Sequence, residues 1–368
     1  MIFRRLRAAH WRNLQPLALE PGPRASVFSG HNGQGKTNLL EAAFYLAEFR
    51  SFRTKTASEL TAWGAPSTRL AAEVTTGGLE RRVEIEIGPG KKLVRIDGKA
   101  MRRDSPALGG FGVVLFVPED LLLPRAAPAA RRSFLDRAAY NVDRLFYGEA
   151  TAFQKVLKSR NALLRRGGVR PVLLETYDEE LARTGARLIE RRRRIAAALG
   201  PRVAQLFVAL HAERAVGIHY RSDPEVAAAL GEAAVATALR LGLERSRALD
   251  LRRGFTGFGP QTDDLDITLD GRLAREHGSQ GQIRSLVLAL KLAELANLGA
   301  TLGEPPLLLL DDVASELDQI RRRKLFETIL ATPGQTFISV TDPDLIPPLP
   351  GRVDFQVTGG EIRLYSPA

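Results

Sequence analysis

The chain has 368 residues, a formal net charge of +11 and no cysteine. The absence of cysteine excludes disulfides, thiolate metal sites and a cysteine nucleophile, and the length permits two or three lobes. No apolar run reaches the roughly 18 residues of a membrane span, and the charged start is too short for a secretory signal. We therefore expect a cytoplasmic protein with no membrane partner. The positive charge favours a polyanionic partner such as nucleic acid, although a merely arginine-rich composition gives the same charge.

The first 50 residues predict two strands, a glycine-rich loop and a helix. The loop, Gly30–Thr37, reads G-H-N-G-Q-G-K-T and fits the phosphate-binding pattern G-x-x-x-x-G-K-[ST]. The strand-like run Ser26–Ser29 precedes it and an apolar-faced helix follows, which is the context that this motif needs. The predicted nucleotide-binding residues are Gly30, His31, Asn32, Gly33, Gln34, Gly35, Lys36, Thr37 and Asn38.

Two side chains of this loop have individual predicted roles. Lys36 should reach the β- and γ-phosphates and is a catalytic candidate, and the Thr37 hydroxyl should bind Mg²⁺. An ordinary glycine-rich turn is the alternative, but such a turn does not need Lys-Thr at the start of a helix with an apolar face.

The next segments predict strands. Residues 69–103 predict an antiparallel meander, because apolar and polar residues alternate along it and Gly77-Gly78 and Asp97-Gly98 supply hairpin turns. Lys91 and Lys92 on this meander are candidate DNA contacts. The apolar run Phe111–Val117 predicts a buried strand.

From about 130 to 250 strand patterns disappear and helical periodicity predicts a helical lobe, without the sustained heptads of a long coiled coil. The expected breaks are Gly167-Gly168, Gly200-Pro201 and Ser222-Asp223-Pro224. One helix carries four candidate DNA contacts, Arg191, Arg192, Arg193 and Arg194. A solvated helix face is the alternative, because a helix spreads four consecutive residues around most of its circumference.

From 263 onward the chain returns to an α/β pattern. The expected elements are a strand at Leu265–Leu269, a helix, a strand at Leu307–Leu310, a helix after Asp318 and a strand at Thr336–Val340. Four consecutive leucines predict a strand buried on both faces of a parallel sheet. Asp311 and Asp312 follow it, where open α/β sheets bind ligands. Asp311 should hold Mg²⁺ and Asp312 should position or deprotonate the attacking water, whereas an acidic helix cap is the alternative.

A second anion site is predicted at Ser279, Gln280, Gly281 and Gln282, directly before a helix with one apolar face. Serine and glycine at a helix N-terminus supply N–H groups, a hydroxyl and the helix dipole. Alone this segment is an ordinary helix cap, but it stands some 30 residues ahead of L-L-L-L-D-D. In ABC-type ATPases the equivalent segment covers the γ-phosphate of the opposite subunit.

These motifs in this order, followed by Ser315-Glu316-Leu317-Asp318, resemble the ATPase head of ABC and SMC proteins. In detail the chain resembles the RecF family of bacterial recombination-repair proteins. Five segments carry that closer resemblance: Trp11-Arg12-Asn13, Phe116-Val117-Pro118-Glu119-Asp120-Leu121, Arg131-Arg132-Ser133-Phe134-Leu135-Asp136, Gly259-Pro260 and Asp263-Asp264.

The resemblance implies an α/β fold: an ABC-type ATPase head with a mixed-sheet lobe I (1–120 and 255–368) and an inserted helical lobe II (121–254). It implies an ATP-dependent homodimer in which Ser279 and Gly281 close on the γ-phosphate held by Lys36 of the other copy, with Ser315 and Asp318 at the interface. It also implies ATP and Mg²⁺ as cofactors and a weak, DNA-stimulated ATPase. The dimer would clamp DNA at single-strand/duplex junctions and work with RecR and RecO to load RecA.

The sequence departs from the common pattern at four places. Asp312 replaces the usual glutamate, which suits slow hydrolysis, and Thr341-Asp342 replaces the switch histidine. Pro118-Glu119 stands about where the lobe-connecting glutamine is expected, and Gln261-Thr262 where His-Arg is expected. Two alternatives from other classes are an ABC transporter-type ATPase subunit and a monomeric P-loop kinase.

Overall fold

The computed structural model describes residues 1–101, 111–143, 145–166, 171–211 and 214–365. The chain forms two compact units. The first unit comprises Met1–Leu121, Ala209–His211 and Leu290–Ala368, and the second comprises Leu122–Val208 and Ala212–Ala289.

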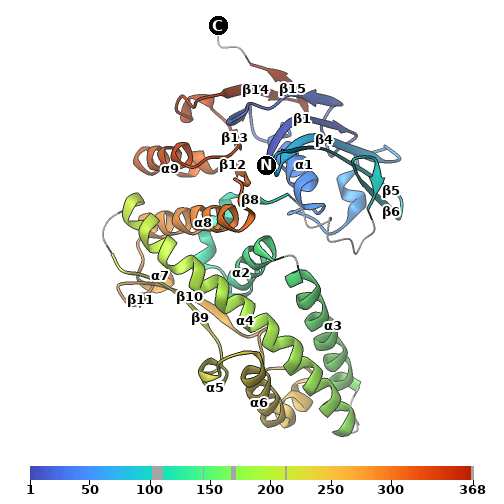
Figure 1. The fold of residues 1–368 in the computed structure, drawn as a ribbon, viewed down its shortest axis with the longest axis vertical. Coiled ribbons are helices and arrows are strands. Elements are labelled where there is room, and N and C mark those ends of the chain that lie inside the picture. Colours follow the sequence, from blue (N-terminus) through green and yellow to red (C-terminus); the bar gives the residue numbers. More distant parts are fainter. Residues whose placement is uncertain (102–110, 144, 167–170, 212–213, 366–368) are drawn as a thin grey trace. The chain divides into compact units, whose positions relative to one another are not determined.

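The first unit contains two six-stranded sheets (Figure 1). Its strands are β1 (Ile2–Ala9), β2 (Leu17–Leu19), β3 (Ala25–Ser29), β4 (Thr68–Thr76), β5 (Leu79–Gly88), β6 (Lys91–Ile96), β7 (Lys99–Ala100), β8 (Val113–Phe116), β12 (Leu307–Asp311), β13 (Thr336–Val340), β14 (Arg352–Thr358) and β15 (Glu361–Leu364). Its helices are α1 (Lys36–Glu48) and α9 (Gln319–Ala331), with the short 3₁₀ helices η1 (Ala57–Leu60), η4 (Val313–Glu316) and η5 (Pro343–Leu345).

One sheet of this unit is antiparallel, in the order β2-β1-β4-β5-β6-β7. The predicted meander is confirmed through β7, with turns at Gly77-Gly78 and Asp97-Gly98, and its last residues, 102 and 103, lie outside the described residues. Alternate side chains of β5, Val83, Ile85 and Ile87, point into the core. The period-2 pattern of the sequence is therefore a half-buried sheet.

The other sheet has the order β15-β14-β3-β13-β12-β8, and only β15 runs antiparallel to its neighbour. Every residue of β3, β12 and β13 is buried, as the leucine run predicts for strands covered on both faces. Helix α1 packs against β12 and β13 of this sheet and against β4 and β5 of the antiparallel sheet. The helix thus carries the phosphate loop on a rigid core layer between two sheets.

Two features of the first unit differ from the prediction. Three strands rather than two precede the phosphate loop, since the short β2 pairs with β1. The C-terminal strands β14 and β15 were not predicted, and β14 lies next to β3, the strand that leads into the loop.

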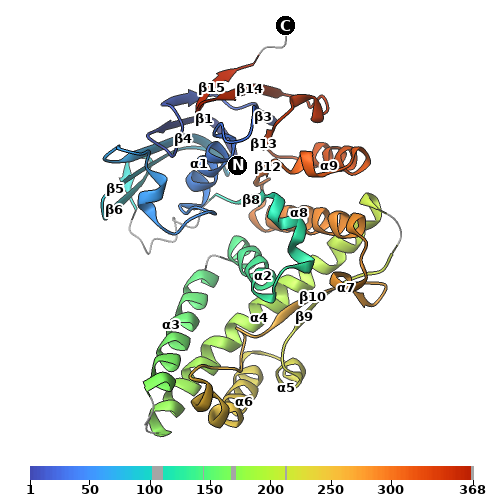
Figure 2. The same ribbon diagram turned by 180° about the vertical axis from the view of Figure 1, so that it is seen from behind.

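The second unit is mainly helical (Figure 2). Its elements are α2 (Pro128–Val142), α3 (Leu145–Arg166), β9 (Val216–Arg221), α5 (Pro224–Ala228), α6 (Glu232–Arg253), β10 (Asp264–Leu269), β11 (Arg272–Leu273) and α7 (Ala274–His277). Three further elements, η3 (Pro118–Arg125), α4 (Pro171–Leu210) and α8 (Gln280–Leu302), cross the boundary between the units.

The prediction that this unit is mainly helical is confirmed, with two exceptions. The expected break at Gly200-Pro201 is wrong, because α4 continues through Pro201, where Leu199 and Val203 are fully buried and packing outweighs the lost hydrogen bond. Strand β9 was missed. The break at Ser222-Asp223-Pro224 is confirmed, since the Asp223 carboxylate accepts a hydrogen bond from Glu225 N at the start of α5, and Gly167-Gly168 lies outside the described residues.

The second boundary between the units differs from the predicted one at residue 255. Residues 255–289 lie in the second unit, because β10 pairs along its whole length with β9 and Asp264 makes a buried ion pair with Arg131 of α2. The first boundary, predicted at residue 120, lies after Leu121.

In the part of the chain that the structure describes, one helix, α8, is long and apolar enough to span a membrane. However, 67% of its most apolar window is buried inside the protein. This is the pattern of a core helix.

Candidate nucleotide-binding site

The phosphate loop connects the end of β3 to the first residue of α1. Its backbone is left-handed at Gly30 (φ +153°) and Gly35 (φ +114°). A Cβ on Gly30 would lie 2.2 Å from the Val357 carbonyl oxygen, and one on Gly35 would lie 2.8 Å from a methyl carbon of Leu14. Only glycine fits both positions, so the motif is required by the fold as well as by phosphate binding.

The Lys36 side chain folds back onto the backbone of this loop. Its ammonium group donates hydrogen bonds to the carbonyl oxygens of Gly30 (2.5 Å) and His31 (3.0 Å). Burial lowers the pKa of Lys36, while the charges of Asp312 and Asp311 oppose that shift. The predicted phosphate-facing cation therefore lies in the same site as both predicted carboxylates.

Asp311 ends β12 and meets the phosphate loop at one edge of the sheet. Its Oδ1 accepts hydrogen bonds from the Thr37 hydroxyl (3.0 Å) and the Ser339 hydroxyl (2.6 Å). Ser339 belongs to β13, the strand between β3 and β12. The three carboxyl ends meet because these strands are parallel neighbours, which is the usual ligand-binding edge of an open α/β sheet.

The pair Thr37–Asp311 fits a magnesium ion that is shared with a nucleotide. Burial raises the pKa of Asp311, the hydrogen bonds from Ser339 and Thr37 oppose that shift, and the nearby charges of Asp312 and Glu119 add to it. A cation here would offset the effects that raise the pKa. Hydroxyl and carboxylate oxygens are suitable ligands, and Mg²⁺ commonly uses one or two protein groups plus phosphates and water. The described residues contain no cluster of three or more His, Cys, Asp or Glu side chains that would hold a metal alone.

Asp312 has a different setting from Asp311. Its backbone is left-handed (φ +51°), and its N–H lies 3.0 Å from the hydroxyl and 3.1 Å from the carbonyl oxygen of Ser339. Its carboxylate accepts a hydrogen bond from the Ser315 hydroxyl. Both predicted catalytic side chains line one open pocket of about 310 Å³. The pocket is lined by Asn32, Gly33, Gly35, Lys36, Thr37, Asn38, Arg53, Asp311 and Asp312.

Hydrogen-bonded polar side chains, of which only Asn38 was predicted as a site residue, run along the rim of this pocket. Arg53 donates to the Asn38 side-chain oxygen (2.6 Å), and Asn38 donates to that of Asn13 (2.7 Å). The Asn13 amide lies 3.4 Å from the Gly33 carbonyl oxygen. Asn13 belongs to the W-R-N segment, so a signal existed for it. Arg53 stands in a loop with no motif.

The rest of the W-R-N segment anchors α1. The fully buried Trp11 donates its indole N–H to the Asn38 carbonyl oxygen (2.9 Å). Arg12 makes two hydrogen bonds, of 2.9 and 2.8 Å, to the buried carboxylate of Glu41. Both contacts fix the first turns of the helix behind the phosphate loop.

The turn between β14 and β15 supports the phosphate loop from outside. Gly359 N–H donates to the Gln34 side-chain oxygen (2.5 Å), and Gly360 N–H donates to the Gln34 carbonyl oxygen (2.9 Å). The Gly360 carbonyl oxygen in turn accepts from Gln15 N–H (2.9 Å). The C-terminal hairpin, absent from the predicted elements, is thus part of the site's frame.

The predicted interface residues have local roles within this chain. Ser315 bonds Asp312, and the Asp318 carboxylate caps α9 through Arg321 N–H (2.9 Å). Both side chains are exposed. Their contact with a second copy stays a prediction.

Comparison with known proteins places the chain. No protein-family model matches it. It is 43% identical to a protein of Anaeromyxobacter sp. (strain Fw109-5), covering 96% of each chain. It is 42% identical to a protein of Myxococcus xanthus (strain DK1622), covering 93% and 92%, and 39% identical to one of Geobacter sulfurreducens, covering 90% of each. All three are called DNA replication and repair protein RecF. The chain belongs to the RecF family.

Solved structures agree with this assignment. The structures of the recombination mediator protein RecF called RecF-ATPrS and RecF-ATP in the RecFOR pathway match 99% of this chain and 98% of theirs, at 30% identity and TM-scores of 0.91 and 0.89. An SMC head bound to the C-winged helix domain of ScpA matches with a TM-score of 0.59 at 14% identity, a likeness of fold alone. The predicted ABC-type head fold is confirmed.

The predicted signature segment lies in the second unit, at the N-terminus of α8. Ser279 N–H donates to the Gln282 side-chain oxygen (2.8 Å), and Gln282 N–H donates to the Ser279 hydroxyl (3.2 Å). This reciprocal pair is a capping box. Ser279 and Gln280 are exposed, so the cap leaves this helix end accessible. Binding of a partner's γ-phosphate by Ser279, Gln280, Gly281 and Gln282 stays a prediction.

Four of the six predicted DNA contacts already have partners within this chain. Arg192 is buried and pairs with Asp136, while Arg191 pairs with Asp143 and Glu149. Arg193 donates to the carbonyl oxygens of Val226 and Ala229. Lys92 donates to the Phe49 carbonyl oxygen, and its ammonium nitrogen lies 4.8 Å from the centre of the Tyr45 ring. Lys91, Lys92 and Arg194 are exposed. DNA contact by any of these six residues stays a prediction.

Two further RecF-like segments, Arg131–Asp136 and Asp263-Asp264, form a structural network inside the second unit. Arg131 pairs with Asp264 through two hydrogen bonds of 2.7 Å, and Arg132 donates to the Asp263 carbonyl oxygen (2.7 Å). Asp136 pairs with Arg192. These residues tie α2 to α4 and to β10.

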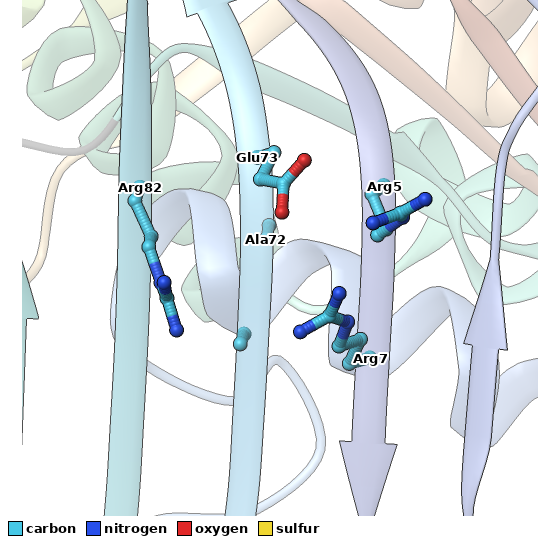
Figure 3. Close-up of a pocket in the computed structure, with 6 residues that line it drawn as sticks. Arg5, Arg7, Ala72, Glu73 and Arg82 are labelled. Carbon is cyan, nitrogen blue, oxygen red and sulfur yellow. The ribbon is translucent and has the colours of Figure 1, made fainter.

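A cluster of arginines also marks the outer face of the antiparallel sheet (Figure 3). Arg5, Arg7 and Arg82 surround Glu73 there. Arg5 pairs with Glu20 and Arg82 with Glu84. The cluster is largely neutralised by carboxylates, so it does not form a continuous basic surface.

Proposed function

We propose that this protein is an ATP-dependent DNA-binding protein of recombinational repair and replication restart, located in the cytoplasm. ATP binding at the described pocket drives dimerisation, and Ser279 and Gly281 of one copy complete the site of the other. The dimer clamps DNA at single-strand/duplex junctions. It supports RecA loading together with RecO and RecR, and hydrolysis releases the DNA.

The observation that carries this proposal is the meeting of Lys36, Thr37 and Asp311 in one pocket, in a chain that matches RecF over nearly its whole length. The relatives' names supply the repair role, and the RecF-ATP structure supplies the nucleotide. A transporter subunit and a monomeric kinase are not favoured, because the full-length relatives are RecF proteins.

Each pocket residue has a separate role in a weak, DNA-stimulated ATPase. Lys36 neutralises phosphate charge, and the loop N–H groups bind phosphate oxygens at the helix N-terminus. Thr37 and Asp311 would hold Mg²⁺, which neutralises charge on the phosphates. Asp312 accepts a proton from, or orients, the attacking water. Its left-handed backbone and its bond to Ser315 hold a short carboxylate in place, which suits slow turnover.

Sedimentation velocity with a non-hydrolysable ATP analogue tests the dimer. The wild-type chain should dimerise only with nucleotide, Lys36→Met should bind nucleotide weakly and stay monomeric, and Ser279→Arg should bind nucleotide yet stay monomeric. A normal dimer from Ser279→Arg would refute the shared site. An absence of nucleotide-linked dimer in the wild type would refute the clamp.

A further inference from the structure

Two helices of the second unit end side by side, and both end in arginine pairs. Helix α3 closes with Arg165 and Arg166, and α6 closes with Arg252 and Arg253. A Cβ placed on Gly254, the C-cap of α6, would lie 3.3 Å from the Cγ of Arg165. Both views of the fold show the two helix ends at the same tip of this unit (Figures 1 and 2).

Buried hydrogen bonds hold the ends of α3 and α6 together about one helical turn before the arginine pairs. Arg160 of α3 donates to Asp250 of α6 and to the Thr256 hydroxyl, both at 2.8 Å. The Asn161 side-chain oxygen accepts from Thr256 N–H (2.8 Å) and from its hydroxyl (2.7 Å). The segment that carries Arg252 and Arg253 is therefore anchored to α3 on both sides.

The four arginines have no acidic partner among the described residues, unlike many other arginines of the unit. All four are exposed. Within the described ranges, no carboxylate lies within 4.0 Å of any of them, whereas the predicted run Arg191–Arg193 is held by internal contacts. The neighbouring residues 167–170 read G-G-V-R and contain no acid.

An aromatic side chain lies next to these charges. Phe255, directly after Gly254, is 49% exposed. Arginine guanidinium groups bind phosphate oxygens, and aromatic rings stack on unpaired bases. Acidic peptides would satisfy the charges but would make no particular use of a planar ring.

We propose that Arg165, Arg166, Arg252 and Arg253 form a binding surface for the DNA sugar–phosphate backbone and that Phe255 stacks on an unpaired base. This inference rests on the proposed DNA-binding function and gives it a location. This surface is separate from the predicted run Arg191–Arg194, of which Arg191, Arg192 and Arg193 are held by contacts inside the unit. Cations in a last turn also suit helix C-termini, so the test separates binding from helix stability.

The test measures DNA affinity by fluorescence anisotropy with the full chain and a non-hydrolysable ATP analogue. The probes are a labelled single-stranded oligonucleotide and a labelled duplex, each titrated at several salt concentrations. The test variant changes all four arginines to glutamine. A matched control changes four exposed or half-exposed arginines of the same unit that each pair with a glutamate: Arg183, Arg187, Arg240 and Arg245.

Both variants lose the same net charge, so only a direct contact separates them. The logarithm of the affinity falls linearly as the logarithm of the salt concentration rises. Each lost phosphate contact should make this slope less steep by about 0.9 for duplex and about 0.7 for single strand. The loss of four contacts on duplex should reduce the steepness of the slope by about 3 to 4. The control should keep the wild-type slope. Replacing the same four residues by lysine should restore most of it, and thermal unfolding of each variant shows that the fold is intact.

The outcomes distinguish a failure of this surface from a failure of the DNA-binding function. Equal slopes for the test and control variants, in a wild type that binds DNA, would refute this surface alone. A wild type that binds neither probe would refute the DNA-binding function itself. Equal competition by poly-glutamate would assign the surface to an acidic protein. Phe255→Leu should weaken single-strand binding by about tenfold and spare the duplex, and unchanged single-strand affinity would remove the stacking contact.

Discussion

The turn between β14 and β15 offers a sharp test of how the phosphate loop is held. Gly360 has φ +80°, and a Cβ there would lie 2.0 Å from the Asn13 carbonyl oxygen. Gly359, next to it, also has positive φ (+57°), but nothing lies within 4 Å of a Cβ at that position. Gly360→Ala and Gly359→Ala therefore share the backbone strain, and only the first displaces the turn.

The difference between the two variants can be estimated from the contacts. The left-handed backbone costs each alanine about 1–2 kcal/mol. The collision at Gly360 also threatens the hydrogen bonds to Gln34 and from Gln15, each of which contributes about 1 kcal/mol. If the loop is displaced with the turn, the additional loss of about 2 kcal/mol corresponds to a roughly 30-fold weaker affinity for ATP.

Titration of both variants with a fluorescent ATP analogue measures this difference, and thermal unfolding reports their stability. Gly360→Ala should bind about 30-fold more weakly than Gly359→Ala. Gln34→Ala, which removes only the side-chain acceptor for Gly359 N–H, should show a smaller loss. Equal ATP affinity for the two glycine variants would refute the idea that the hairpin supports the loop.

Three further predictions concern single buried or catalytic groups. Asp312→Asn should trap an ATP-bound dimer with little hydrolysis, as phosphate release and sedimentation would reveal, and unchanged turnover would remove Asp312 from the water-positioning role. Arg160→Leu leaves Asp250 buried without its cationic partner and Asp178 with Arg247 alone, and it should cost about 3–5 kcal/mol in urea unfolding; a loss below about 1 kcal/mol would contradict the importance of these ion pairs. Burial raises the pKa of Asp263 to about 6, so the folded state binds its proton more tightly and stability should fall as pH rises from about 4 through 6. Asp263→Asn should remove that fall from urea unfolding measured across this range, and an identical pH profile would contradict it.

The sequence determined much of the nucleotide site at the carboxyl edge of the parallel strands. G-H-N-G-Q-G-K-T and L-L-L-L-D-D each predicted a strand and the group at its end, because local periodicity and glycine spacing are local properties of the chain. It also predicted the meander and its turns. The meeting of Thr37 with Asp311, 274 residues later, followed from a general rule for parallel sheets.

The sequence did not determine which charges remain available. A run of four arginines in a helix looks the same whether its side chains face water or carboxylates. In the structure Arg191 and Arg192 pair with acids from α2 and α3 or the segment between them, whereas Arg165 and Arg252, from separate helices, meet at one tip. Pairing of this kind depends on residues that are far apart in sequence, so no local pattern predicts it.

Local pattern therefore fixed the identity of the nucleotide site, and tertiary structure decided its frame and its surroundings. Strand β14 belongs to the frame, yet its residues show no motif, because it acts through backbone hydrogen bonds that almost any sequence can make. The turn at Gly360 needs glycine, but a glycine in a turn does not show what the turn contacts. Strand β10 belongs to the second unit because it pairs with β9, and this pairing depends on the whole fold. Motif chemistry is encoded locally, whereas support and accessibility arise from packing.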